Sequence, residues 1–335
     1  MRAILDSERV RIDSWLTEDD ERSLGRDVLA GLTRTFKQLP PKHFYDARGS
    51  ELFEQITELP EYYPTRTELE ILRDRADEIV ALSGAGELVE LGSGASSKAR
   101  ILLDAMERAG TLRRYVPLDV SESVVREEAE QLVRDYETLT VHGVIGDFER
   151  HLGELPAGGD SPRLVALLGG TIGNFTPEAR RTLLRKIASL LRGEDALLLG
   201  TDLVKDPAVL EAAYNDSQGV TAEFNRNVLY VINRELGADF VPEDFEHVAR
   251  FDTQNEWIEM RLRATRDCVV TIAGLDLSVT FVAGEEMRTE ISAKFTRRRV
   301  EDDLAAAGLV LDSWLTDSDR MFALSLVRGA RRDGE

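Results

Sequence analysis

The sequence has 335 residues, which is enough to bury a large core and favours two domains over one. Its 42 lysine and arginine residues against 62 aspartate and glutamate residues give a net charge of −20, so nucleic acid and anionic membranes are not expected as partners. With 42% hydrophobic and 31% charged residues it has the composition of a soluble globular enzyme, and no apolar run is long enough to span a membrane.

The N-terminal residues are not expected to form a signal peptide. Residues 1–15 have apolar side chains separated by charges and no continuous hydrophobic segment, so we expect no signal peptide and a cytoplasmic protein. The single cysteine, Cys268, cannot form an intrachain disulfide. The four histidines lack the spacing of metal ligands, and we predict no metal site.

The first predicted element is an amphipathic helix within residues 17–36, where apolar residues recur at helical spacing. Residues 42–68 are rich in aromatic side chains and are predicted to form a short helix between two loops. Phe53 in this helix is a candidate either for the core or for a ligand site. Tyr62 and Tyr63 lie between two prolines and cannot both be buried easily, because each hydroxyl needs a hydrogen-bond partner. One of the two tyrosines is therefore expected to line a pocket.

Residues 87–98, ELVELGSGASSK, predict a strand, a glycine turn and a helix. They follow a helix that is expected to open with a capping box formed by Thr67 and Glu70. Glycine permits a tight turn and lets a ligand approach the backbone, while free N–H groups of the next helix point at that ligand. The pattern indicates a nucleoside site, although an ordinary strand-to-helix turn has the same letters.

Acidic residues follow two further predicted strands. Asp119 lies 27 residues beyond Gly92 (119 − 92), a spacing that suits a carboxylate bound to both hydroxyls of a ribose. Asp147 and Phe148 follow a third strand and could supply a hydrogen bond and an aromatic wall for adenine. The alternative for each aspartate is a helix N-cap.

Two more strands, at residues 164–168 and 196–199, complete an alternation of strands and helices that predicts a parallel sheet covered on both faces. The pattern changes after residue 206. Residues 251–281 alternate like antiparallel strands, which indicates a separate lobe. A helix and a final hairpin of two strands are expected after the lobe, at residues 298–307, 309–315 and 321–327.

The strand order, the GxG turn, the acid after the second strand and the closing hairpin resemble the class I S-adenosylmethionine-dependent methyltransferases. A dehydrogenase is the alternative, but the loop lacks the third glycine of GxGxxG. The segments PEYYPTRTE, ELGSGASSK, GGTIGNF, GTDLVKD, FNRNVL and GEEMRTEISAKF together resemble the histidine Nα-methyltransferases of ergothioneine biosynthesis. The resemblance covers residues 42–327. It implies an α/β fold, a doubly wound seven-stranded sheet with an inserted α+β substrate-binding lobe.

The resemblance also implies the residues of the site. S-adenosylmethionine, which leaves as S-adenosylhomocysteine, would be held by Gly92, Lys98, Asp119, Asp147 and Phe148. The amino acid would be bound by Tyr62, Asn174, Tyr214, Glu290, Ser292, Met260, Tyr45 and Phe53, with Tyr62 and Asn174 also catalytic.

Each polar residue in this set has a defined expected role. Asn174 and Tyr214 would bind the carboxylate of the amino acid, and Glu290 and Ser292 the imidazole. The last two are two positions apart on a predicted strand and should share one face. The alternatives are a turn residue for Asn174, a solvated strand charge for Glu290 and an exposed first-turn lysine for Lys98.

The expected reaction is trimethylation of the α-amino group of L-histidine to hercynine, the first step of ergothioneine biosynthesis. Its partners would be histidine and the mono- and dimethylated intermediates, with a monomeric protein as the expectation. Residues 67–204 and 295–330 would form the cofactor domain, and residues 13–66 and 205–294 the substrate domain. A methyltransferase for another amino acid and a cofactor-binding protein without turnover are the alternatives.

Overall fold

The computed structural model describes residues 2–6, 8–17, 23–94 and 97–330. The chain divides into two compact units: unit 1 comprises Met1–Thr17, Thr67–Leu203 and Phe295–Glu335, and unit 2 comprises Glu18–Arg66 and Val204–Lys294. Residues 13–17, which were predicted to belong to the substrate domain, cluster with unit 1. The reason is that the strand containing Ser14 pairs with the strand containing Ile145 in the unit 1 sheet.

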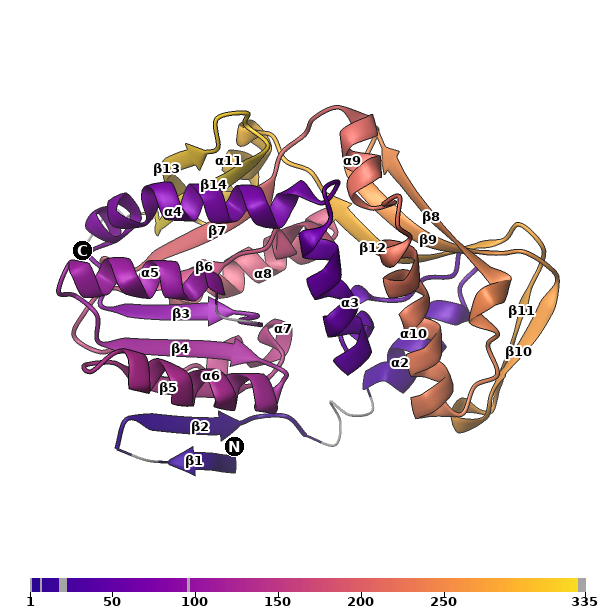
Figure 1. The fold of residues 1–335 in the computed structure, drawn as a ribbon, viewed down its shortest axis with the longest axis horizontal. Coiled ribbons are helices and arrows are strands. Elements are labelled where there is room, and N and C mark those ends of the chain that lie inside the picture. Colours follow the sequence, from indigo (N-terminus) through magenta and orange to yellow (C-terminus); the bar gives the residue numbers. More distant parts are fainter. Residues whose placement is uncertain (1, 7, 18–22, 95–96, 331–335) are drawn as a thin grey trace. The chain divides into compact units, whose positions relative to one another are not determined.

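Unit 1 is built on a nine-stranded sheet with the order β1-β2-β5-β4-β3-β6-β7-β14-β13 (Figure 1). Strands β5, β4, β3, β6 and β7 are parallel, and β14 is antiparallel to both β7 and β13. These seven strands confirm the predicted doubly wound sheet. The strands of this sheet are β1 (Arg2–Asp6), β2 (Val10–Ser14), β3 (Glu87–Leu91), β4 (Arg114–Asp119), β5 (Thr140–Ile145), β6 (Arg163–Leu167), β7 (Ala196–Asp202), β13 (Leu309–Thr316) and β14 (Phe322–Gly329).

Strands β1 and β2 extend the predicted seven-stranded sheet and were not expected from the sequence. Strand β2 pairs in parallel with β5, and β1 pairs antiparallel with β2. Val10 and Ile12 are buried while Arg11 between them is exposed, which is the alternation of a strand with one covered face. Asp13 is buried as well, so the alternation covers only three residues and is too short to distinguish a strand from scattered apolar residues.

Helices cover both faces of the unit 1 sheet. Helices α4, α5 and α6 share a buried apolar cluster with the strands, to which Leu72, Leu103 and Leu132 belong. Helices α8 and α11 are joined by a buried ion pair between Arg180 and Asp303 at 2.7 Å. Strand β3 is buried along its whole length, as expected for a parallel strand covered on both sides. The helices are α4 (Tyr63–Ser83), α5 (Ser97–Arg108), α6 (Glu122–Asp135), α7 (Phe148–His151), α8 (Pro177–Leu190) and α11 (Arg297–Ala305), with 3-10 helices η2 (Leu152–Glu154) and η3 (Thr171–Asn174).

The start of α4 differs from the prediction. The helix begins at Tyr63, so Thr67 lies inside it and does not open a capping box. Pro64 occupies its first turn, where proline is tolerated because that N–H group has no partner within the helix. Glu68 also lies within this helix and is buried.

Unit 2 contains two antiparallel sheets, as expected for the inserted lobe. One has three strands in the order β12-β9-β8, and β10 and β11 form a separate hairpin. Helix α10 packs on the three-stranded sheet, where its Asn225 donates to the Arg261 carbonyl of β9 at 3.0 Å. The elements are α2 (Ser23–Leu32), η1 (Pro41–Phe44), α3 (Ala47–Glu58), α9 (Pro207–Ala213), α10 (Val220–Leu236), η4 (Pro242–Asp244), β8 (Phe245–Asp252), β9 (Trp257–Ala264), β10 (Cys268–Ile272), η5 (Ala273–Leu275), β11 (Leu277–Phe281) and β12 (Glu286–Ala293).

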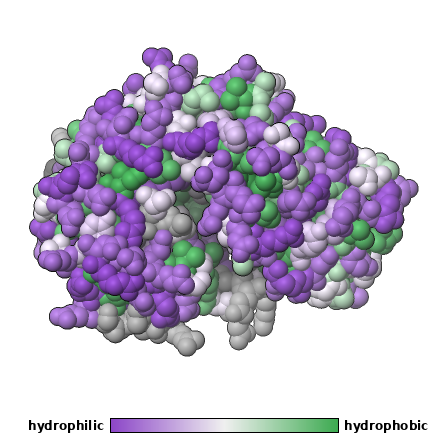
Figure 2. Space-filling model, viewed as in Figure 1, coloured by the Kyte–Doolittle hydropathy of each residue, from purple (hydrophilic) through white to green (hydrophobic). Residues whose placement is uncertain are grey.

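The face of the molecule in Figure 2 is strongly polar. On the face shown in Figure 2, hydrophilic residues predominate and hydrophobic residues form small separate patches. In the described part of the chain, no helix has both the length and the hydropathy that a membrane crossing needs.

Candidate active site

The predicted glycine turn follows β3 in unit 1. Gly92 and Gly94 have positive φ angles of 74° and 47°, a conformation that favours glycine because it has no Cβ. The Gly92 N–H donates to the Leu118 carbonyl at 2.8 Å. A Cβ at Gly92 would lie 3.7 Å from the Phe148 ring, while a Cβ at Gly94 would meet no atom of the described residues within 4 Å. The turn is therefore tight, open at Gly94 and bordered by the aromatic ring that the sequence predicted for adenine.

Asp119, at the end of β4, stabilises this turn through hydrogen bonds. One carboxylate oxygen accepts from the Gly94 N–H and the other from the Ser121 N–H, both at 3.0 Å. Helix α6 begins at Glu122 with Ser121 in the cap position, so Asp119 is not the N-cap residue. Its carboxylate instead connects the ends of β3 and β4.

Asp147 does occupy the cap position that was its alternative. Its side chain accepts from the Glu149 N–H at 2.8 Å at the start of α7, and its own N–H donates to His151 Nδ1 at 3.0 Å. The next residue, Phe148, packs edge-on against Phe175 at 6.3 Å between ring centroids. Asp147 and Phe148 thus flank the same strand end, as predicted.

Lys98 is held by a carboxylate that was not predicted from the sequence. Its ammonium lies 2.6 Å from Oε2 of Glu68, a residue of α4 that is almost fully buried. The Gly169 N–H donates to both oxygens of the same carboxylate at 2.9 Å. Glu68 therefore connects α4, α5 and the turn of Gly169 and Gly170, both of which have positive φ angles. Asn174 ends η3, directly after this turn, and is half-buried.

In unit 2, a β-bulge determines which side chains of β12 face α10. The register of β12 against β9 shifts between Arg288 and Glu290, so that Thr289 is an extra residue. Beyond the bulge, Glu290 lies opposite Met260 and Ser292 lies opposite Ile258. Glu290 and Ser292 therefore share one face of β12, as their spacing predicts, and Met260 lies on the same face of the sheet.

A network of hydrogen bonds between uncharged groups connects the bulge to α10. Thr289 donates to Oδ1 of Asn225 at 2.6 Å, and Nδ2 of Asn225 lies 2.8 Å from Nδ1 of His247. The other His247 nitrogen lies 2.8 Å from the Tyr214 carbonyl, to which only an N–H can donate. His247 is therefore the neutral tautomer protonated on Nε2, and burial lowers its pKa accordingly. The network links the bulge to the backbone of Tyr214.

Four predicted aromatic residues come together in unit 2. The ring of Tyr45 lies 5.6 Å from that of Phe53, Phe53 lies 6.2 Å from Tyr62, and Tyr62 lies 6.2 Å from Tyr214. Tyr62 and Tyr214 are buried, whereas Tyr45 is 43% exposed. The rings form a continuous aromatic surface that leads to the polar residues of β12.

Those polar residues are buried together. The Tyr214 hydroxyl and Oγ of Ser292 are 2.8 Å apart, and the Lys294 ammonium donates to both, at 3.0 and 2.9 Å. Lys294 is completely buried. Burial also raises the pKa of Glu290 to about 7. Lys294 was missed, although the alternation of residues 290, 292 and 294 could have identified it.

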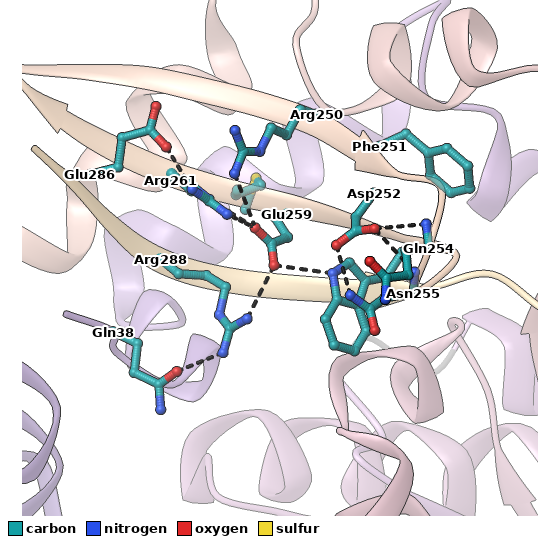
Figure 3. Close-up of polar contacts among 12 residues, drawn as sticks. Gln38, Arg250, Phe251, Asp252, Gln254, Asn255, Glu259, Arg261, Glu286 and Arg288 are labelled. Carbon is teal, nitrogen blue, oxygen red and sulfur yellow. Dashed lines mark hydrogen bonds and ion pairs between the residues drawn. The ribbon is translucent and has the colours of Figure 1, made fainter. Parts of the chain in front are cut away.

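The opposite face of the three-stranded sheet carries an ionic network (Figure 3). Glu259 on β9 pairs with Arg261 and with Arg288, the latter at 3.1 Å, and Arg261 pairs with Glu286 at 2.6 Å. Burial acts to raise the pKa of Glu259, but the two guanidinium groups lower it below its usual value. Arg288 also donates to Gln38 at 2.6 Å. This face stabilises the sheet and contains none of the predicted site residues.

Comparison with known proteins gives a consistent result. Residues 24–329 match the family model described as histidine-specific, S-adenosylmethionine-dependent methyltransferases. The chain is 54% identical over 319 residues to the histidine N-alpha-methyltransferase of Mycobacterium tuberculosis, covering 95% of this chain and 99% of that protein. It is 55% identical over 304 residues to the enzyme of the same name from Mycolicibacterium smegmatis, covering 91% and 94%.

A more distant relative is the ergothioneine biosynthesis protein 1 of Neurospora crassa, which is 32% identical over 282 residues. The match covers 82% of this chain and 31% of the fungal protein. The chain belongs to the histidine-specific, S-adenosylmethionine-dependent methyltransferase family.

Proposed function

We propose that this protein transfers three methyl groups from S-adenosylmethionine to the α-amino nitrogen of L-histidine and so forms hercynine in ergothioneine biosynthesis. Membership of the histidine-specific family supports the reaction class. The observation that carries the substrate assignment is the buried pair of Glu290 and Ser292 on one strand face, beside the aromatic rings of unit 2. A carboxylate and a hydroxyl can bind the two nitrogens of one imidazole.

The residues of unit 1 fit the cofactor. Among the described residues, the buried Ser93 hydroxyl between the two turn glycines has no hydrogen-bond partner, and the position of a Gly94 Cβ is open. We propose that the absence of a side chain at Gly92 lets the cofactor approach the backbone. Asp119 is assigned to the ribose, Asp147 and Phe148 to the adenine and Lys98 to the carboxylate of the cofactor. When bound, S-adenosylmethionine supplies a methyl group activated by its sulfonium sulfur.

The chain itself has to hold and deprotonate the amine. Only a neutral nitrogen is nucleophilic, and the α-amino group of a free amino acid has a pKa above neutral, so a proton must leave before transfer. We assign Tyr62 to the amine, where its hydroxyl or a water can accept this proton. Asn174 and Tyr214 are assigned to the substrate carboxylate, which fixes the direction of the amine. Fixing the geometry is the main contribution expected for an in-line displacement.

The aromatic residues suit the products of each step. Successive methylation gives a trimethylammonium group, a cation that is attracted to the faces of aromatic rings. We assign this role to Tyr45 and Tyr62, and we assign Phe53 and Met260 to the apolar contacts of the imidazole ring. The mono- and dimethylated intermediates would occupy the same residues.

The proposal also covers the roles of the two units, the location of the protein and its oligomeric state. Unit 1 would bind the cofactor, and unit 2 would bind the amino acid. We propose a cytoplasmic location and a monomeric state, which cell fractionation and size-exclusion chromatography test.

The function is tested by incubating the protein with S-adenosylmethionine and each of the twenty amino acids and recording product masses. Addition of three methyl groups to histidine alone is the expected result. Methylation of another amino acid instead, or cofactor binding without any methylated product, would contradict the proposal.

A further inference from the structure

Lys294 is a buried cation beside residues that we assign to the amino acid. It directly follows β12 and is fully buried. Its ammonium contacts the oxygens of Tyr214 and Ser292 and also lies 4.6 Å from the centre of the Tyr214 ring. A buried lysine is rare because removing an ammonium from water is costly, so its position calls for a compensating role.

The hydrogen bonds of Lys294 orient the two hydroxyl groups. An ammonium can only donate, so both hydroxyl oxygens accept from it. The two hydroxyls are also 2.8 Å apart, and one hydroxyl proton occupies the bond between them. When Tyr214 donates to Ser292, Ser292 can direct its own proton to an acceptor atom of the substrate. The pair then acts as a donor, which suits an unprotonated imidazole nitrogen or a carboxylate oxygen.

Lys294 also affects the charge of Glu290. Burial raises the pKa of Glu290 to about 7, and the positive charge of Lys294 acts in the opposite direction. Tyr45, Tyr62 and Tyr214 are further titratable residues of this cluster, and Met260 opposite Glu290 is neutral. Without the ammonium, the carboxyl would be protonated over a wider pH range. A protonated carboxyl is a donor as well as an acceptor and would no longer select an imidazole N–H.

We propose that Lys294 is a specificity-determining and positioning residue for histidine. It orients the Ser292 and Tyr214 hydroxyls as donors and keeps Glu290 an acceptor, so that the two nitrogens of a neutral imidazole meet one donor and one acceptor. This inference rests on the proposed function.

The test compares Lys294→Met, which removes both the charge and the donors, with Lys294→Gln, whose amide can still donate. Lys294→Met is expected to raise KM for histidine at pH 7 roughly ten- to a hundredfold. Affinity for S-adenosylmethionine, measured by calorimetry, should change less than about twofold, because the Lys294 ammonium donates to Tyr214 and Ser292, which are assigned to the amino acid. The Gln variant should keep more histidine affinity than the Met variant.

Lys37→Met is the matched control. Lys37 also lies over an aromatic ring, that of Phe281 at 4.8 Å, and pairs with Glu285 in the same unit. It contacts none of the proposed substrate residues, and its kinetics should equal those of the unaltered protein. Unchanged histidine kinetics in a folded Lys294→Met variant would overturn the inference. So would loss of folding in both Lys294 variants, because this outcome would assign Lys294 to fold stability alone.

The pH dependence of kcat/KM provides a second measurement, which would not change if Lys294 had a purely structural role. The acidic limb should shift to higher pH by about one unit in Lys294→Met, which corresponds to a tenfold change in proton affinity. The same substitution made in a Glu290→Gln background should produce no shift, because the titrating carboxyl is absent. An equal shift in both backgrounds would contradict the link to Glu290. Failure of the unaltered protein to methylate histidine would instead contradict the proposed function.

Discussion

Glu290 is the side chain on which recognition of the imidazole depends most. It is buried beside Met260, and an ionised carboxylate there needs a donor. A histidine N–H supplies one, whereas a phenylalanine ring would leave the carboxylate unpaired. The residue thus both favours histidine and disfavours apolar amino acids of similar shape.

Glu290→Ala should lower kcat/KM for histidine roughly ten- to a hundredfold, which corresponds to about 1.5–3 kcal/mol for a charge-assisted hydrogen bond. Affinity for the cofactor should hardly change. Relative activity on larger aromatic amino acids should rise, and rise further when Met260 is also made smaller. Steady-state kinetics on both substrate classes provide the measurement.

Glu246→Ala is a suitable comparison because Glu246 lies on β8 of the same sheet and its side chain is 60% exposed. Its kinetics should match those of the parent. If Glu290→Ala also left histidine kinetics unchanged, the assignment of the imidazole site would be wrong.

Asp119→Ala should weaken binding of S-adenosylmethionine, because the carboxylate would make charge-assisted bonds to the ribose worth about 1.5–3 kcal/mol each. The substitution also removes the acceptor for the Gly94 N–H, so the turn loses one of its supports. Asp119→Asn, which keeps an acceptor oxygen, separates these effects. Calorimetry should show weak binding for both variants, and normal binding by Asp119→Asn would restrict the residue to a role in the turn.

At the scale of secondary-structure elements, the bulge in β12 has the largest effect on the site. Strand residues alternate between faces, so one additional residue transfers every later side chain to the opposite face. Met287 and Glu290 both lie opposite residues of β9 on the α10 face only because Thr289 is inserted between the two registers. Without the bulge, Glu290 would point toward the ionic network of Figure 3.

Thr289→Val tests the support of the bulge, because valine has nearly the same shape but no hydroxyl. The loss of the 2.6 Å bond to Asn225 leaves a buried amide oxygen without its donor, and the free energy of unfolding should fall by about 1–3 kcal/mol. The KM for histidine should rise because Glu290 follows directly. Urea unfolding and kinetics should both be unaffected in Thr280→Val, an exposed threonine of β11. Full stability of Thr289→Val would contradict the supporting role.

At the scale of the whole molecule, buried carboxyl groups make stability dependent on pH. Burial raises the pKa of Glu90 to about 8 and that of Glu290 to about 7, whereas an unfolded glutamate has a pKa of about 4.3. Between these values the folded chain binds more protons than the unfolded chain. The stabilising contribution of the two protonated carboxyl groups is therefore complete below about pH 4, and it is lost as the pH rises through their pKa values in the folded chain.

Glu90→Gln should reduce this dependence while keeping an acceptor for the Tyr115 hydroxyl, which lies 2.5 Å from Glu90. The parent should lose more stability than the variant between pH 5.5 and pH 8, by on the order of 2–3 kcal/mol. Denaturant unfolding at the two pH values measures the difference. Glu194→Gln, on the surface, should behave like the parent, and an identical loss in Glu90→Gln would refute the prediction.

The sequence alone determined the positions of the seven main strands along the chain, the glycine turn and the acids at the strand ends. These features are local, because periodicity, a positive φ angle or a short run of apolar residues depends on neighbouring residues. Resemblance to a known family then extended the prediction to Glu290 and Ser292, although spacing alone indicated only that they share a face.

Only the tertiary structure revealed the bulge at Thr289, the bridge from Glu68 to Lys98, the added strands β1 and β2 and the buried ammonium of Lys294. Each of these features depends on side chains or backbone groups that a different element contributes. A threonine in a strand does not indicate an extra residue, and a glutamate in a helix does not show that a distant lysine and a glycine N–H surround it. The physical reason is that burial and hydrogen-bond partners arise from contacts between segments that are far apart in the chain.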